Sequence, residues 1–580
     1  MPEMKKTDPL RLPLKHEKLP FSDIYFNGRP LFVLPRGSRR DDAKRAVVEH
    51  VEMVNRVADL VASGLGPNGR YKLISADGGV TFLTSDAFTI FSKVMLKHPL
   101  EQVTAGAGID VARVTGAGST TTIILVAEVL NNLLPLIKDG MKQSAVVAGC
   151  VLAYKRAMAS LDSSAFRPER PLEWIEKIVS TALTGTVLNE HRGYFGQIVR
   201  DCVEITQAFK TGEPWRIDDV YVRTQTGGSV TESRVINGLA LMREPMHLSM
   251  PKSLRRGRLL LVQGEFMVPL KGGTMYYEHT FRATSPEEYR RLLTSKPGML
   301  RSLVQRVVLT KANVILLERG VEDYLIDLFA REGVVLLRRF PPPEWQHVIE
   351  VTGALPVSIH TATPSDAVGV ESVEYRRIGD SDWWLLEGFE GPRSCEIFVR
   401  GPDTLFLQEA ERLLKGCLKS LRPYLQDPRL VYGGGSFELA LGEALKRRAI
   451  EIESKEQLVV DKVGEAFMSI PRRLAASAGL DPIDAMISIR SSNARAKSHT
   501  YGVDGISRRI ADVSRIPIVE PLHVKRQCLQ TAFETIITIL RIDNVIQSRE
   551  YSKEEKHYLE RQEKNSPENR ERILKEQGVW

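Results

Sequence analysis

Apolar residues near the start of the chain repeat every three or four positions, which is the spacing of one helix face. The positions are Val47, Val51, Val54, Ala58 and Val61. Two aspartates, Asp41 and Asp42, precede them, as is usual at a helix N-terminus. The pattern predicts a helix that begins near residue 41 and ends at residues 64–69, where the sequence L-G-P-N-G follows a further glycine.

The same spacing predicts further helices over residues 101–114, 144–161 and 174–210. Alternation at residues 80–83 predicts a short strand, and Thr84–Ala87 has the residue types of a helix N-cap. His98-Pro99 is predicted to end the helix that begins there.

The character of the chain changes near residue 220, where strand-like runs begin to alternate with helical ones. Apolar runs at 259–262, 314–317 and 334–337 are interleaved with helical segments at 287–306, 321–331 and 343–352. Alternation of this kind predicts an α/β unit with a partly parallel sheet.

Helical spacing returns after a predicted strand at residues 396–399. One stripe contains Phe406, Ala410, Leu413, Cys417 and Leu421. Gly416 lies inside this helix, where Gly costs roughly 1 kcal/mol relative to Ala, so it is either tolerated or packs closely against something. Another glycine-rich turn, residues 433–435, opens the next helix. Residues 1–40 suit an extended arm with a short strand at 30–34, and the charged residues 548–580 suit a solvated tail.

Composition excludes several classes of protein. A chain of 580 residues needs two to four domains. The net charge of +8 comes from 80 basic and 72 acidic residues that are intermixed, so it does not indicate specific nucleic-acid binding. Five scattered cysteines argue against disulfides and structural zinc, and the N-terminus has no apolar signal segment. We therefore expect a cytoplasmic protein without membrane spans.

The most informative stretch is Val114–Leu125, V-T-G-A-G-S-T-T-T-I-I-L. Its glycines let backbone N–H groups point into one concavity, and a helix that starts at the hydroxyl residues adds the positive end of its dipole. The stretch therefore predicts a cradle for an anion such as phosphate. It contains neither a lysine nor a carboxylate that could hold Mg²⁺.

Several motifs, taken in order, resemble those of the group II chaperonins, the family of thermosome and eukaryotic cytosolic chaperonin subunits. L-G-P-N-G at 65–69 is similar to the family's L-G-P-x-G, and T-S-D-A-F-T-I at 84–90 to its T-N-D-G-x-T-I. V-R-G at 399–401, G-G-G at 433–435 and G-L-D-P-I-D at 479–484 also match. The strongest match is V-E-P-L-H-V-K at 519–525 followed by I-L-R-I-D-N-V-I at 539–546.

The resemblance implies an α+β multidomain chaperonin subunit. It implies a mainly helical equatorial domain from residues 1–147 and 403–547, an intermediate domain from 148–220 and 371–402, an α/β apical domain with a helical protrusion at 221–370, and a charged tail at 548–580. It also implies ATP or ADP as ligand, unfolded client proteins as partners, and other chaperonin subunits in a homo- or hetero-oligomeric double ring. It implies no membrane and no specific nucleic-acid partner.

The resemblance also implies which residues contact the nucleotide. They are Gly66, Pro67, Gly69, Asp86, Gly116, Gly118, Ser119, Thr120, Thr121, Gly434, Gly435, Asp504, Glu520 and Lys525. Two family carboxylates are absent. The phosphate loop reads G-A-G-S-T-T where the family has G-D-G-T-T-T, so Ala117 replaces the aspartate that holds the metal, and Gly416 replaces the aspartate that orients the attacking water. Asp86 is retained.

These departures predict a chaperonin-like subunit in which ATP hydrolysis is lost or strongly impaired, while nucleotide binding and Mg²⁺ binding are left open. The alternative is an active ATP-dependent folding subunit that draws the missing carboxylates from elsewhere. A remote alternative is a short-chain-dehydrogenase-like enzyme, because V-T-G-A-G-S resembles that phosphate turn, although the further glycines and acidic residue are missing.

Aromatic residues in the middle of the chain are candidates for client binding. Tyr276, Tyr277, Phe281 and Tyr289 fall within a Gly- and Pro-bounded segment, residues 272–297. They suit either a local core or a protruding surface that binds partner proteins.

Overall fold

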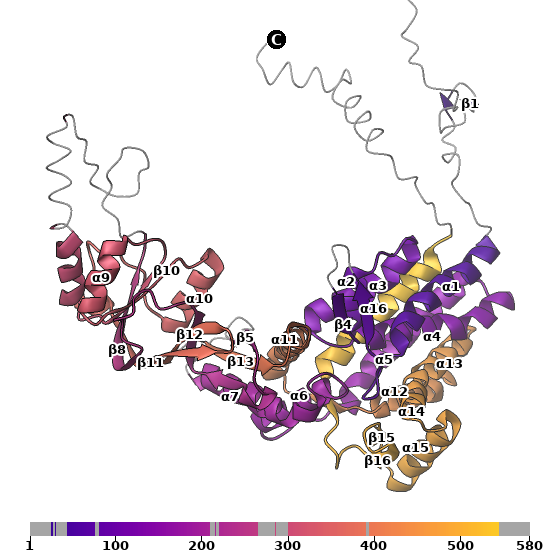
Figure 1. Ribbon diagram of the computed structural model, residues 1–580. Coiled ribbons are helices and arrows are strands. Elements are labelled where there is room, and N and C mark those ends of the chain that lie inside the picture. Colours follow the sequence, from indigo (N-terminus) through magenta and orange to yellow (C-terminus); the bar gives the residue numbers. More distant parts are fainter. Residues whose placement is uncertain are drawn as a thin grey trace, which may run out of the picture. The chain divides into compact units, whose positions relative to one another are not determined.

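The computed structural model describes residues 25–26, 29–30, 43–75, 81–208, 215, 220–264, 285, 298, 300–389 and 394–543 (Figure 1). Residues 51–540 form one compact unit, and residues 1–50 and 541–580 form another. The predicted aromatic client-binding residues and the charged tail lie outside the described residues, as does most of the N-terminal arm. Within that arm, β1 (Tyr25–Phe26) pairs antiparallel with β2 (Arg29–Pro30).

The first part of the chain is helical, as its apolar spacing predicts. Helix α1 (Ala43–Ala62) buries Val51, Val54, Ala58 and Val61, and it ends before Gly64. After the hairpin of β3 (Lys72–Ser75) and β4 (Thr81–Thr84) come four helices. They are α2 (Ala87–Lys93), α3 (Pro99–Thr115), α4 (Ser119–Lys138) and α5 (Gln143–Leu161).

His98-Pro99 begins a helix, and the prediction that it ends one is wrong. Helix α2 already ends at Lys93, where Val94 turns to extended backbone. His98 Nδ1 accepts from the backbone N–H of Leu100 at 3.2 Å, and the Glu101 carboxylate accepts from the backbone N–H of His98 at 3.3 Å. This reciprocal capping box, with Pro99 at the first helical position, is a start signal, since proline lacks only an N–H that is unsatisfied there anyway.

The segment predicted as one helix over residues 174–210 forms two, α6 (Ile175–Leu183) and α7 (Arg192–Ala208). The chain turns at Gly185, whose φ is +75°, a left-handed conformation that favours glycine. A Cβ on Gly185 would also lie 2.5 Å from the Pro67 carbonyl oxygen, so the turn is packed against another loop.

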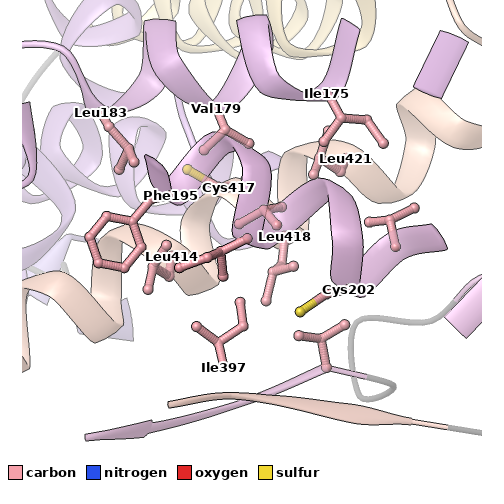
Figure 2. Packing of buried hydrophobic residues seen from close by; sticks show 14 of the residues in the cluster. Ile175, Val179, Leu183, Phe195, Cys202, Ile397, Leu414, Cys417, Leu418 and Leu421 are labelled. Atoms are coloured by element: carbon pink, nitrogen blue, oxygen red, sulfur yellow. The ribbon is translucent and has the colours of Figure 1, made fainter. Parts of the chain in front are cut away.

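A three-stranded sheet lies against these helices. Strand β13 (Cys395–Gly401) pairs parallel with β5 (Val220–Thr226) and antiparallel with β6 (Arg234–Ile236). Apolar side chains from the sheet, from α6 and α7, and from α11 (Thr404–Gln426) form one core (Figure 2). Those labelled in Figure 2 are Ile175, Val179, Leu183, Phe195, Cys202, Ile397, Leu414, Cys417, Leu418 and Leu421.

The predicted partly parallel sheet is confirmed. Its strand order is β10-β9-β8-β11-β12-β7, and β8 (Ser253–Val262), β9 (Val314–Leu317) and β10 (Val335–Arg338) are parallel. Antiparallel pairs join β11 (Val368–Ile378) to β8 and to β12 (Ser381–Phe389), and β12 to β7 (Gly238–Met242). Helices α9 (Asp323–Arg331) and α10 (Pro342–Thr352) belong to separate cores that share this sheet. Val314 and Leu316 face one core and Ile315 and Leu317 the other, so β9 is apolar throughout.

The last part of the chain is helical with short strands. Its helices are α12 (Ser436–Ala449), α13 (Glu456–Phe467), α14 (Ser469–Ser477), α15 (Pro482–Ala496) and α16 (Leu522–Arg541). Strand β14 (Leu430–Tyr432) pairs with β17 (Val519–Pro521), and β15 (Tyr501–Asp504) pairs with β16 (Arg509–Asp512). Helix α13 packs against α4 and α5, so sequence-distant halves share one helical body.

Two segments, Ser119–Lys138 and Gln143–Ser164, are long and apolar enough to cross a membrane by length and composition alone. Half of the apolar window of the first, 50%, is buried. Helix α4 contacts α3, α13 and α14 in the helical body, and this packing accounts for its apolar composition.

Two glycines inside helices differ in their surroundings. Gly149 of α5 is buried, and a Cβ there would lie 2.4 Å from Val459 Cβ of α13. Gly106 of α3 has nothing within 4 Å of its Cβ position. Gly149 therefore permits close packing of α5 against α13, whereas no neighbouring residue requires a glycine at position 106.

We predict opposite effects of the same substitution at these sites. Gly106→Ala should stabilise by about 0.5–1 kcal/mol, because Ala loses less backbone entropy in a helix. Gly149→Ala should destabilise by about 1–3 kcal/mol through overpacking. Thermal melts of both variants check this, and a Gly149→Ala midpoint at or above that of Gly106→Ala would contradict it.

Candidate functional site

Glycine-rich turns from distant parts of the chain meet around one cavity of about 490 Å³. Twelve of the sequence-predicted nucleotide contacts line it. They are Gly66, Pro67, Asp86, Gly116, Gly118, Thr120, Thr121, Gly434, Gly435, Asp504, Glu520 and Lys525. Ala117 and Gly416, the two positions without their expected carboxylates, line it as well. Ser119 and Gly69 do not.

The predicted anion cradle has the expected local geometry. Gly116 caps the C-terminus of α3 with φ +74°, and Gly118 caps the N-terminus of α4 with φ +88°. Both conformations are left-handed, which glycine adopts without strain. Because α4 starts at Ser119, its first backbone N–H groups have no intrahelical partners, and Thr120 and Thr121 face the cavity. Ser119 is only 3% exposed, and its hydroxyl lies 3.5 Å from Asp86 Oδ1.

The cradle is held by backbone contact with α11. A Cβ on Gly116 would lie 2.3 Å from the Gly416 carbonyl oxygen, and a Cβ on Gly416 would lie 2.9 Å from the Gly116 carbonyl oxygen. Neither position accepts a side chain unless the loop and the helix separate. The glycine inside α11 therefore fits closely against the loop, in addition to lacking a carboxylate.

Two other loops of the cavity, at Gly185 and Gly505, pack closely against Pro67. Besides Gly185, Gly505 approaches it, since a Cβ on Gly505 would lie 2.2 Å from Pro67 Cγ. Asn68 Nδ2 donates to the Gly505 carbonyl at 2.9 Å. Gly69 closes the turn by donating its N–H to the Gly66 carbonyl at 3.0 Å. This hydrogen bond closes the turn of residues 66–69, which contains Pro67.

Asp86 is a cap and an ion-pair partner. Its Oδ2 accepts from the backbone N–H and the hydroxyl of Thr89, both at 3.0 Å, which confirms the predicted N-cap of α2. Arg412 Nη1 lies 3.2 Å from the same oxygen. Arg412 also donates to both oxygens of the buried Glu409, at 2.8 and 2.9 Å. Desolvation lowers the pKa of Arg412, but Glu409 and Asp86 outweigh it, so the net shift is upward.

Lys525 is buried between two carboxylates. Its Nζ lies 2.8 Å from Glu438 Oε1 and 2.8 Å from Glu520 Oε1, and its side chain is 7% exposed. Desolvation lowers the pKa of Lys525, but the two glutamates reverse this, so the net shift is upward and the ammonium stays charged. Glu438 was not predicted. Its place two residues into the helix that follows the 433–435 turn is the signal that could have found it.

Every carboxylate that lines the cavity already has a partner. Asp86 pairs with Arg412, and Glu438 and Glu520 share Lys525. Asp504 Oδ1 accepts from the backbone N–H groups of Ile506 and Ser507, both at 3.1 Å. The Ala117 side chain packs against an apolar cluster of Val111, Val524 and Cys528. Across the described residues, no three His, Cys, Asp or Glu side chains gather in a group that could hold a metal ion.

The turn between α6 and α7 adds a wall that the sequence did not predict. Ser180, Thr181, Thr184 and Arg192 line the cavity from this side. Arg192 Nη1 donates to the Asn189 carbonyl at 3.0 Å, and it has no carboxylate partner within the described ranges. These residues carry hydroxyl and cationic groups but belong to no glycine-rich motif, so nothing in the sequence marked them.

The sequence profile of the TCP-1/cpn60 chaperonin family matches residues 57–550, which include every element of this cavity. The chain belongs to the TCP-1/cpn60 chaperonin family. The predicted α+β chaperonin fold is therefore confirmed, with helical parts at both ends and sheet-containing parts between them.

The similarity extends over nearly the whole chain. A thermosome subunit of Pyrococcus horikoshii is 29% identical over 531 residues, covering 91% of this chain and 96% of that protein. The thermosome subunit beta of Thermococcus kodakarensis and the thermosome subunit alpha of Archaeoglobus fulgidus are each 28% identical with the same coverage. These relatives support the group II resemblance.

We predict that Lys525 is essential for stability because it compensates two carboxylates. Lys525→Met should destabilise the helical body by about 3–5 kcal/mol, since it leaves the buried Glu438 unpaired. Adding Glu438→Gln and Glu520→Gln should restore a large part of this loss, because no uncompensated charge remains. Urea midpoints of the single and triple variants check this. Equal midpoints for the two would show that the charges do not matter.

Proposed function

We propose that this chain is a chaperonin subunit that keeps a nucleotide pocket but hydrolyses ATP very slowly or not at all, and that binds unfolded or partner proteins. One observation carries the proposal: each carboxylate that lines the cavity is engaged within the protein, and positions 117 and 416 supply none. The family resemblance implies ATP as the nucleotide, and the glycine turns and the α4 N-terminus offer backbone donors for its phosphates.

The donor set at the phosphate end does not fit Mg²⁺. Bound Mg²⁺ needs one or two carboxylates in addition to phosphate oxygens and water. Asp86 is the cavity carboxylate that contacts the cradle, with Ser119 Oγ 3.5 Å from its Oδ1, but its other oxygen caps α2 and pairs with Arg412. Among the described residues, Asp86 Oδ1 is therefore the single carboxylate oxygen left beside the cradle, and the positive charge of Arg412 on the same carboxylate disfavours a second cation there.

Slow hydrolysis follows from these losses, whereas weak binding does not. Phosphoryl transfer depends on neutralising charge on the phosphates and on placing the attacking water. Removing such groups costs orders of magnitude in rate. Binding depends instead on backbone N–H groups and a helix dipole, which do not require the two missing side chains.

We also propose a division into three parts, with three of the predicted boundaries moved. The helical core around α4 and α13 and the cores of the six-stranded sheet suit an equatorial and an apical domain. Helix α11 shares its core with α6, α7 and β13, so we place it with the intermediate domain and set that boundary near residue 427 in place of 402. Strands β11 and β12 pair within the six-stranded sheet, so we place residues 371–389 with the apical domain. Strands β5 and β6 pair with β13, so we extend the first intermediate segment to residue 236 in place of 220.

The alternative function is an active ATP-dependent folding subunit, in which neighbouring subunits of a ring supply what this chain lacks. The two are separated by turnover of the purified chain and of the assembly isolated from its own cells.

We predict ATP turnover below about 10⁻³ s⁻¹ for the purified chain, far under the usual enzyme range. ADP affinity, measured by calorimetry, should change less than about threefold when EDTA replaces Mg²⁺, because no metal bridges the phosphates. Ala117→Asp should make ADP binding Mg²⁺-dependent by about tenfold, or roughly 1.4 kcal/mol.

Ala117→Asn is the matched control, since it has the same shape without the charge and should stay Mg²⁺-independent. We leave Gly416 unchanged because a side chain there would force α11 away from the loop. Turnover above the stated rate, or a tenfold Mg²⁺ effect in the unmodified chain, would refute the proposal.

The client-binding part of the proposal rests on the aromatic residues of the 272–297 segment. Replacing Tyr276, Tyr277 and Phe281 with Ser should reduce capture of a denatured model protein at least several-fold, because apolar contact area is lost. Light scattering of aggregating client measures capture, and thermal melts test folding. Full capture by a folded variant would return these residues to a local core.

A further inference from the structure

A second cavity, of about 640 Å³, lies on the other side of the glycine turn that opens α12. Its lining residues come from the end of α5 and the loop after it, from α12, and from the segment before β15. They are Ser160, Ser163, Ser164, Ala165, Phe166, Tyr432, Ser436, Phe437, Ala440, Ala444, Arg447, Arg448, His499 and Thr500. Its volume falls within the range of small-molecule sites.

The formal charges that line this cavity are the two guanidinium groups of Arg447 and Arg448. Arg447, Arg448 and His499 line it, and its lining includes no carboxylate. In the part of the chain that the structure describes, neither guanidinium forms an ion pair, although Arg residues nearby on the same body, such as Arg490 with Glu443 at 2.9 Å, do. Two adjacent unpaired arginines facing one cavity suit an anion, since guanidinium binds phosphate and carboxylate oxygens in pairs.

One wall of the cavity is aromatic. The Phe166 and Tyr432 rings stack with centroids 4.6 Å apart and an interplanar angle of 21°, and Trp174 packs edge-on against Phe166 at 5.3 Å. Such a fixed aromatic pair offers an apolar edge or face to a planar ring.

The serine hydroxyl oxygens of the cavity can accept hydrogen bonds from a ligand. Ser163 and Ser164 both donate to the Ser160 carbonyl, at 2.8 and 3.2 Å, and Ser436 donates to the Gly433 carbonyl at 2.9 Å. With their hydrogens committed to backbone oxygens, these hydroxyls can only accept. They suit the N–H or O–H groups of a ligand, whereas its anionic group must bind the arginines.

We propose that this cavity binds an organic phosphate that carries a planar ring, with the phosphate on Arg447 and Arg448 and the ring against Phe166 and Tyr432. The ligand would be a regulator, because two segments line both cavities. The 432–436 turn places Tyr432 and Ser436 here and Gly434 and Gly435 in the first cavity, and residues 499–505 are divided in the same way. The Val503 N–H donates to the Gly434 carbonyl at 2.8 Å, which ties the two segments together.

The probe is phenyl phosphate, with inorganic phosphate and phenol as its separated halves. Calorimetry should give a Kd of about 1 mM or lower for phenyl phosphate, and binding at least about tenfold weaker for either half. The double variant Arg447→Gln/Arg448→Gln should weaken phenyl phosphate binding at least about tenfold. Arg495→Gln is the matched control, because Arg495 is also exposed and unpaired in the described structure but does not line the cavity.

Coupling has its own readout, which does not depend on nucleotide binding. Phenyl phosphate should slow amide hydrogen exchange at residues 433–436 and 501–505 in the unmodified chain and not in the double variant. The proposal is overturned if phenyl phosphate does not bind at millimolar concentration. It is also overturned if the double variant binds as tightly as Arg495→Gln, or if inorganic phosphate alone binds equally well.

Discussion

The site depends on glycines that let neighbouring loops and helices approach closely. Gly116 and Gly416 come so close that neither position accepts a Cβ, and Gly185 and Gly505 both press against Pro67. These contacts join the helical body to α11 and to the α6–α7 turn. A side chain at any of these positions would have to push two elements apart, so the glycines set the shape of the cavity that they line.

Charge within the site is satisfied internally. Lys525 with its two glutamates, and Arg412 with Asp86 and Glu409, form closed groups in which every charge has an opposite partner close by. Such groups are costly to break, because a lone charge in a poorly hydrated site is destabilising. The same partners that stabilise the fold therefore keep the carboxylates from other tasks. The arrangement leaves the backbone N–H groups and the helix end of the cradle available for the phosphate that we propose, whereas metal binding would need carboxylates without such partners.

Residue spacing and type predict the elements of this chain that depend on local sequence, but not those that depend on contacts between distant segments. The helix of residues 43–62, the N-cap at Asp86 and the parallel strands β8, β9 and β10 followed from spacing and residue type, because burial of one face or of both faces leaves a regular pattern. His98-Pro99 was misassigned because a proline after a polar residue marks a helix start as well as an end. The spacing does not predict the break at Gly185, because the apolar period continues on both sides of it and the loop that packs against it, at Pro67, lies more than a hundred residues away.

By itself, the sequence determined the family resemblance, the glycine turns and the presence of Ala and Gly at positions 117 and 416, because each is a matter of which residue type stands at a position in a motif. Only the tertiary structure decided that Gly416 touches Gly116, that Glu438 shares Lys525 with Glu520, and that Arg412 occupies Asp86. It also placed a second cavity behind the 433–435 turn. These features depend on which distant segments meet, and side-chain pairing across such contacts leaves no period or motif in the linear order of residues.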